Sequence, residues 1–281
     1  MKEMKSLFRN LSLTGATLLA GATFLLSACS SGNAQTLSAP TPASVTTALA
    51  PNTTAVLVHG AWAEGSSWNA VIPLLQQAGM KVVAVELPRS SLSEDAAAVT
   101  RTIDLQTGPV ILVGHSYGGA VITQAGNNAK VSALVYVAAF APDSGQSINT
   151  VTAPFPTPAW ESSLVVDEGG YLSVPTATIL SVFAPDVPTA QANLMAATQG
   201  PIFNHCLADT VTTAAWHTKP SWWVVSGQDQ VIPAALQQAT AQQIGATVSI
   251  SPQSSHFVMV SHPTDVAAAI IAAANKTAAA Q

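Results

Sequence analysis

The sequence predicts an α/β protein built on a sheet of about six mainly parallel strands with helices on both faces. From residue 54 onward, short β-rich runs alternate with stretches whose apolar residues recur at helical spacing. Several runs are continuously apolar, as strands buried on both faces require. Strands that alternate with helices form a parallel sheet whose right-handed crossovers place helices on each side. A hydrophobic content of 48% in 281 residues is sufficient for a sizeable core.

The predicted elements follow one another at regular spacing. Six strands are expected at residues 55–58, 81–87, 110–113, 131–139, 222–226 and 246–250. Ser93 is expected to cap the helix after the second strand, and another helix begins just after Ser116. The last two helices are expected at 233–244 and 264–274.

The alternation stops for about seventy residues, from about 143 to 219. This stretch is rich in Pro, Thr and Ala, and it is too long for a simple loop. Open α/β sheets bind their ligands at the carboxyl ends of the strands. We therefore expect the stretch to be an inserted cap over that edge of the sheet.

The N-terminus has the pattern of an export signal. Basic residues precede an apolar stretch that ends in Leu-Ser-Ala-Cys, which resembles a bacterial lipobox with Cys29 as the acylated residue. The expected organisation is a signal peptide at 1–28, a lipidated Cys29 with a flexible tether to residue 53, and a folded domain at 54–281. This predicts an exported lipoprotein, membrane-anchored, in the periplasm or at the cell surface. A permanent membrane span and an ordinary cleaved signal are the alternatives.

The low content of charged residues argues against a nucleic-acid partner. Charged residues make up 8% of the chain, the formal net charge is −5, and basic residues cluster only in the first ten positions. Nucleic-acid binding requires a basic face, so we expect a small-molecule substrate instead. The histidines are scattered and Cys206 has no cysteine partner once Cys29 is acylated, so we expect no metal site and a buried, unreactive Cys206. The sequence leaves the oligomeric state open.

The segment Gly114-His115-Ser116-Tyr117-Gly118 fits the G-x-S-x-G pattern. It follows a buried strand and opens a helix, which is the setting of a nucleophile elbow. Small residues on both sides let neighbouring backbones approach while the Ser116 hydroxyl projects. The alternative is a glycine-rich turn with a capping serine.

A serine nucleophile needs a base, and the base needs a carboxylate that fixes its tautomer. His256 follows the last predicted strand, with His262 as its rival. Asp229 follows the fifth predicted strand, with Asp143 as the second choice. The predicted triad is therefore Ser116, Asp229 and His256, in that chain order.

Acyl transfer also requires N–H donors directed at the developing oxyanion. One is the backbone N–H of Tyr117, and the second is expected from Ala61, where Gly60 permits the turn. A mainly apolar substrate pocket is expected from aromatic residues, which could instead form the cap's own core. These residues are Trp62, Phe155, Trp160, Phe183, Phe203 and Phe257.

Over residues 54–274 the chain resembles the α/β-hydrolase superfamily, in a bacterial esterase-like branch related to plant methyl esterases and hydroxynitrile lyases. The resemblance depends on the segments HGAW, SSWNAVIPLL, GHSYGGAVI, VYVAAFAPDSGQS, GQDQVIP and SSHFVMVSHP. It implies the α/β-hydrolase fold and a cofactor-free serine hydrolase. In that enzyme Ser116 attacks, His256 transfers the proton, Asp229 orients His256, and Ala61 and Tyr117 hold the oxyanion.

Two positions separate the esterase from the lyase within this resemblance. Hydroxynitrile lyases of the group carry a Thr after the strand-end His and a Lys after the catalytic His, where this chain has Gly60 and Phe257. Without a cation to stabilise departing cyanide, hydrolysis of small to medium carboxylic esters through an acyl-enzyme is preferred. The alternatives are C–C bond, lactone or perhydrolytic chemistry on the same triad, or a ligand-binding homologue with low turnover.

Overall fold

The computed structural model describes residues 49–279. The predicted signal peptide, Cys29 and nearly all of the tether lie outside these residues. Within the described part of the chain, no helix is both long enough and apolar enough to span a membrane.

The centre of the fold is a six-stranded sheet in which every neighbouring pair is parallel, with the order β2-β1-β3-β4-β8-β9. Its strands are β1 (Thr54–Val58), β2 (Lys81–Val85), β3 (Val110–His115), β4 (Val131–Val137), β8 (Ser221–Ser226) and β9 (Thr247–Ser251). β1, β3 and β8 are buried along their whole length, as their continuous apolar sequences predict. The prediction of a six-stranded, mainly parallel sheet is confirmed.

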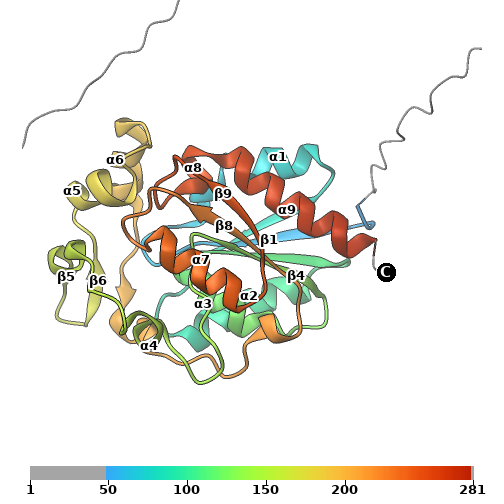
Figure 1. The fold of residues 1–281 in the computed structure, drawn as a ribbon, viewed down its shortest axis with the longest axis horizontal. Helices are drawn as coiled ribbons and strands as arrows, with labels where there is room; N and C mark the ends of the chain where they lie inside the picture. The colour runs from blue at the N-terminus through green and yellow to red at the C-terminus, as the bar shows by residue number, and fades with distance from the viewer. Residues whose placement is uncertain (1–48, 280–281) are drawn as a thin grey trace, which may run out of the picture. The chain divides into compact units, whose positions relative to one another are not determined.

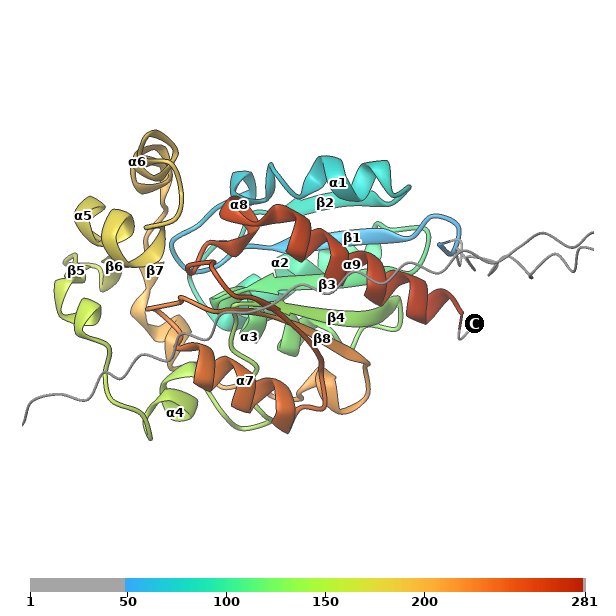
Figure 2. The same cartoon turned by 45° about the horizontal axis from the view of Figure 1, so that its top comes forward.

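Helices cover both faces of this sheet (Figure 1, Figure 2). They are α1 (Ile72–Gln77), α2 (Leu92–Asp104), α3 (Tyr117–Ala125), α7 (Ala234–Gln243), α8 (Val258–Ser261) and α9 (Pro263–Ala278). In Figure 2, α1 and α9 lie on one side of the sheet, and α3 and α7 lie on the other. This two-sided covering explains why the central strands contain few polar residues.

The helix after β2 begins two residues earlier than the sequence predicted. Ser91, not Ser93, is its N-cap: the Ser91 hydroxyl accepts the N–H of Glu94 at 3.1 Å. The backbone N–H of Leu92, at the start of the helix, donates a hydrogen bond to the carboxylate of Asp209 at 2.9 Å. A contact from a distant part of the chain therefore helps to set the start of this helix.

Between β4 and β8 the chain leaves the main sheet. Residues 143–219, here called the cap, contain a second, antiparallel sheet with the order β5-β6-β7. The strands are β5 (Val165–Val166), β6 (Tyr171–Ser173) and β7 (Ile202–Phe203). The helices are α4 (Ile148–Thr152), η2 (Ala159–Ser163), α5 (Thr176–Thr178), η3 (Ile179–Phe183), α6 (Thr189–Thr198), η4 (Asn204–Leu207) and η5 (Ala215–His217). In Figure 1, α5, α6, β5 and β6 stand together beside one end of the main sheet.

Candidate active site

Ser116 occupies a sharp turn between β3 and α3. Its backbone has φ 52° and ψ −122°, a left-handed conformation that costs an L residue conformational energy. A Cβ on Gly114 would press against the backbone carbonyl of Gly118 and come within 2.9 Å of the N atom of Gly119. The turn therefore needs glycine at this position, and it directs the Ser116 side chain toward the end of the sheet.

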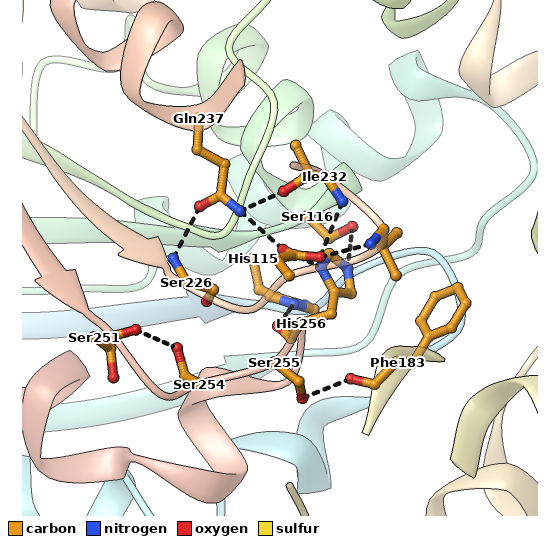
Figure 3. A network of polar contacts seen from close by, with 12 residues as sticks. His115, Ser116, Phe183, Ser226, Ile232, Gln237, Ser251, Ser254, Ser255 and His256 are labelled. Atoms are coloured by element: carbon orange, nitrogen blue, oxygen red, sulfur yellow. Dashed lines mark hydrogen bonds and ion pairs between the residues drawn. The ribbon is translucent and has the colours of Figure 1, made fainter. Parts of the chain in front are cut away.

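The structure brings Ser116, His256 and Asp229 together, although they are far apart in the sequence. The Nε2 atom of His256 lies 3.0 Å from the Oγ atom of Ser116. Its Nδ1 atom lies 2.9 Å from the Oδ2 atom of Asp229. The three residues follow β3, β9 and β8, and each is buried, with no more than 7% of its surface exposed. Figure 3 shows Ser116 and His256 close to each other at the centre of this network.

The carboxylate of Asp229 is surrounded by donors. Its Oδ1 atom accepts the backbone N–H groups of Val231 and Ile232, at 2.7 and 2.9 Å. Its Oδ2 atom accepts the side-chain N–H of Gln237 at 2.8 Å, in addition to that of His256. Because every neighbour donates, the site is built for a group that only accepts, which is a carboxylate.

Gln237 is a functional neighbour that the sequence analysis missed. Its side chain is buried on α7, and its carbonyl oxygen accepts the N–H of Ser226 at 3.1 Å while its amide donates to Asp229. It thereby ties the end of β8 to the carboxylate (Figure 3). No sequence signal separates Gln237 from the adjacent Gln238, because the difference is which side of the helix faces the sheet.

Two further histidines hold the backbone around the site. His115 is buried and lies 3.0 Å, through Nε2, from the carbonyl oxygen of His256. A carbonyl only accepts, so Nε2 carries the proton; burial, followed by the charge of His256, holds the pKa of His115 well below its usual range. His59 donates from Nδ1 to the carbonyl of Gly60 at 2.8 Å and accepts the N–H of Leu87 at 3.1 Å. Both side chains therefore support the backbone around the site.

The second choices for the base and the acid, His262 and Asp143, lie outside the triad. The Nδ1 atom of His262 is 2.9 Å from the hydroxyl of Ser261 and 3.7 Å from a carboxylate oxygen of Asp186. The carboxylate of Asp143 pairs at 2.7 Å with the exposed His217. Neither rival contacts His256 or Ser116, so the geometry favours the first choices.

The two predicted oxyanion donors lie beside Ser116. Ala61, Tyr117 and Ser116 line one cavity. Within residues 49–279, the backbone N–H groups of Ala61 and Tyr117 donate no hydrogen bond. A Cβ on Gly60 would come within 2.9 Å of both the Nδ1 atom of His115 and the Cβ atom of Ser116. Glycine therefore lets this loop approach the nucleophile, which leaves two free donors at the mouth of the cavity.

The cavity at Ser116 has a volume of about 800 Å³ and is lined mainly by apolar side chains. Three predicted pocket residues form part of its wall: Trp62, Phe155 and Trp160. Glu161 is the one acidic residue in the lining, and burial raises the pKa of its carboxyl above the usual value.

The other three predicted pocket residues do not line this cavity. Phe183 lies behind the wall, where it packs edge-on against Trp160 with ring centroids 4.9 Å apart. Phe257 is buried and lines a separate cavity of about 320 Å³. Phe203 packs against Tyr171 of the small antiparallel sheet, with ring centroids 5.3 Å apart. For these residues the prediction was wrong, because apolar character predicts burial but not the surface against which a side chain is buried.

Cys206 is buried, as predicted. Burial raises the pKa of its thiol to about 12, so the side chain stays protonated at neutral pH. It is therefore unsuited to act as a nucleophile.

Comparison with known proteins defines the class of this fold and site. The sequence pattern of the alpha/beta hydrolase family matches residues 55–269. The chain therefore belongs to the alpha/beta hydrolase family.

The relatives cover most of the chain. Salicylic acid-binding protein 2 of Nicotiana tabacum is 27% identical over an alignment of 255 residues that covers 79% of this chain and 96% of that protein. A pyrethroid hydrolase of Sphingobium wenxiniae is 27% identical over an alignment of 248 residues that covers 76% of this chain and 85% of that protein. The crystal structure of polyneuridine aldehyde esterase superposes with a TM-score of 0.70 at 20% identity, covering 79% of this chain and 98% of the other.

A shorter match links the chain to the lyases. An alpha-hydroxynitrile lyase of Arabidopsis thaliana is 37% identical over an alignment of 103 residues that covers 31% of this chain and 40% of that enzyme. The fold and the predicted branch are thus confirmed. A carbendazim hydrolyzing esterase of Nocardioides sp. is 37% identical over an alignment of 107 residues that covers 33% of this chain and 44% of that protein. With this esterase and the pyrethroid hydrolase among the relatives, the prediction of an enzyme that hydrolyses carboxylic esters is confirmed at this general level.

Proposed function

We propose that this protein is a serine hydrolase that cleaves small to medium carboxylic esters through an acyl-enzyme on Ser116. The proposal depends on one observation, the continuous hydrogen-bonded chain from Ser116 through His256 to Asp229, with distances of 3.0 and 2.9 Å. The three hydrogen-bonded residues are buried, and Ser116 lines the cavity of about 800 Å³.

Each step of the reaction has a residue in place. The Oγ atom of Ser116 attacks the ester carbonyl carbon while His256 Nε2 takes its proton, and the free N–H groups of Ala61 and Tyr117 stabilise the oxyanion. Protonated His256, stabilised by Asp229, then gives this proton to the leaving alcohol, and the acyl group stays on Ser116. His256 next activates a water molecule, which attacks the acyl carbonyl, releases the acid and restores the Ser116 hydroxyl.

The cavity favours neutral esters with an aryl or short alkyl group. Its wall has no lysine or arginine within the described residues, and the chain carries a formal net charge of −5. An anionic substrate would therefore meet no counter-charge and an unfavourable overall field. Trp62, Phe155 and Trp160 offer ring faces and edges against which an aryl group packs favourably.

A fluorophosphonate probe tests the proposed function directly. We expect one probe molecule per protein, and peptide mass mapping should locate it on Ser116. The unlabelled enzyme should turn over p-nitrophenyl acetate and p-nitrophenyl butyrate. The label forms because His256 activates the Ser116 hydroxyl toward phosphorus as it does toward carbon.

Other outcomes of this experiment contradict the proposal. Labelling that persists in Ser116→Ala would place the nucleophile elsewhere. A protein that is stabilised thermally by an ester but releases no p-nitrophenol would be a ligand-binding homologue.

We also propose that the protein is an exported lipoprotein, held at a membrane by an acyl chain on Cys29. The support is the sequence alone: a basic start, an apolar stretch up to residue 28, and the Leu-Ser-Ala-Cys boundary. In the bacterial host, intact mass after membrane extraction should show a chain that begins at Cys29 and carries fatty acyl groups.

The two cysteines provide a matched control for this anchor. Cys29→Ser should lose the acyl groups and the membrane association, whereas Cys206→Ala should keep both because Cys206 is buried in the folded domain. Retention of the same acylated species in Cys29→Ser would refute the anchor.

A further inference from the structure

The loop that carries His256 is held by the cap as well as by the main sheet. Asp186 lies in the cap, three residues after η3, and one of its carboxylate oxygens accepts the backbone N–H of Ser255 at 2.8 Å. The hydroxyl of Ser255 contacts the other oxygen of the same carboxylate. Ser255 is 1% exposed and directly precedes His256. The residue before the base is thus bound at two points by one cap carboxylate.

The same cap segment also holds the other side of His256. The carbonyl of Phe183 accepts the N–H of Phe257 at 3.4 Å and lies 2.9 Å from the Ser255 hydroxyl. The Phe183 ring stands edge-on to the imidazole of His256, with centroids 5.6 Å apart and planes at 87°. Figure 3 shows Phe183 next to Ser255 and His256. The backbone N–H groups on both sides of the base therefore end on cap residues 183–186.

Residues at the ends of the main-sheet strands also contact His256. Nε2 of His115 lies 3.0 Å from its carbonyl oxygen, and the carboxylate of Asp229 lies 2.9 Å from its Nδ1 atom. The bond to Asp229 orients the ring, but it leaves the position of the loop backbone to the contacts of its neighbours. A displacement of about 1 Å in an active site can lower a rate by roughly a hundredfold. The cap contacts are therefore in a position to affect catalysis.

We propose that Asp186 is a positioning residue for His256: its carboxylate, through Ser255, holds the imidazole within proton-transfer distance of Ser116, so that docking of the cap completes the catalytic site. This inference rests on the proposed serine hydrolase function. Asp186 itself touches neither Ser116 nor His256, so it acts only through the loop.

Asp186→Asn is the informative variant because it keeps the size of the side chain. The structure aims two donors of Ser255, an N–H and an O–H, at the two carboxylate oxygens. An amide keeps one acceptor oxygen for the Ser255 N–H, but the Ser255 hydroxyl must then accept from the NH₂ group and turn its own proton to the Phe183 carbonyl, so both charge-assisted bonds to the carboxylate are lost. We expect kcat for p-nitrophenyl butyrate to fall roughly ten- to hundredfold, with KM within about twofold, because the base is displaced and the substrate cavity is kept.

Asp167→Asn is the matched control. Asp167 is also a cap carboxylate that accepts two backbone N–H groups, those of Gly169 and Tyr171, at 2.8 and 2.9 Å. It is exposed and has no contact with the His256 loop. Its replacement should leave kcat within about twofold of the unmodified enzyme, because surface changes away from such features have small effects.

A proton NMR signal separates positioning from general loss of structure. The Nδ1 proton of His256 in its bond to Asp229 should give a downfield resonance that is absent in His256→Ala. We expect this resonance to broaden or shift in Asp186→Asn and to stay unchanged in Asp167→Asn. If Asp186→Asn does not fold, as judged by thermal unfolding, Ser255→Ala replaces it: it removes one of the two contacts and should lower kcat roughly three- to tenfold.

The possible results are distinct. Unchanged kcat and an unchanged resonance in folded Asp186→Asn, or in Ser255→Ala where that variant replaces it, would overturn the inference. So would an equal loss of kcat in Asp167→Asn. Activity that persists in Ser116→Ala would instead overturn the proposed function, so the two failures can be told apart.

Discussion

His256→Ala is expected to lower kcat for p-nitrophenyl butyrate by a factor on the order of 10⁶, close to the loss in Ser116→Ala. The 3.0 Å contact from His256 to Ser116 is the only route in the described structure by which the hydroxyl proton leaves. Because the two side chains act as one unit, Ser116→Ala/His256→Ala should be no slower than either single variant. Steady-state kinetics on protein purified from a host that lacks esterases would measure this.

His205→Ala serves as the control for this variant. Its side chain is 70% exposed, and its imidazole pairs with Asp209 and stacks on Phe203, away from the triad, so turnover should stay within about twofold of the unmodified rate. Should His262→Ala lose turnover while His256→Ala keeps more than a tenth of it, the base would be the rival histidine and the proposed mechanism would be wrong.

The sequence predicted best where the chemistry is local. One contiguous segment contains the strand that ends at His115, the strained turn at Ser116 and the helix that starts at Tyr117. The sequence pattern of this segment therefore predicts the strand, the turn and the nucleophile together. Asp229 and His256 were also predictable, because parallel strands end at one edge of a sheet and each residue follows such an end. Topology alone then brings three distant residues together.

Prediction was poorer where a position is set by contacts between distant segments. Composition identified the apolar residues of the cap, but Phe155 lines the cavity while Phe203 packs into the small sheet. Ser91 and Ser93 are equal candidates for a helix cap until the contact from Asp209 to Leu92 is known. Asp186 and Gln237 belong to no motif, because their roles depend on which loop or strand end lies next to them.

Asp229→Asn is expected to lower kcat by a factor on the order of 10⁴ while the fold is kept. The carboxylate accepts from four donors: Val231, Ile232, Gln237 and His256. An asparagine has one acceptor oxygen, so its NH₂ group must face either the two backbone N–H groups or the pair formed by Gln237 and His256. The backbone N–H groups cannot reverse, so the NH₂ group should turn toward His256.

In that orientation the imidazole can keep a hydrogen bond only by accepting at Nδ1, which moves its proton to Nε2. His256 would then present an N–H to Ser116 and could no longer remove the hydroxyl proton. The loss should therefore appear in kcat and in the rate of fluorophosphonate labelling, with thermal unfolding close to that of the unmodified protein. Asp143→Asn, at the rival carboxylate that pairs with His217, should keep full turnover. If the losses were reversed between these two variants, His256 would be oriented by a carboxylate other than the one 2.9 Å from its Nδ1 atom.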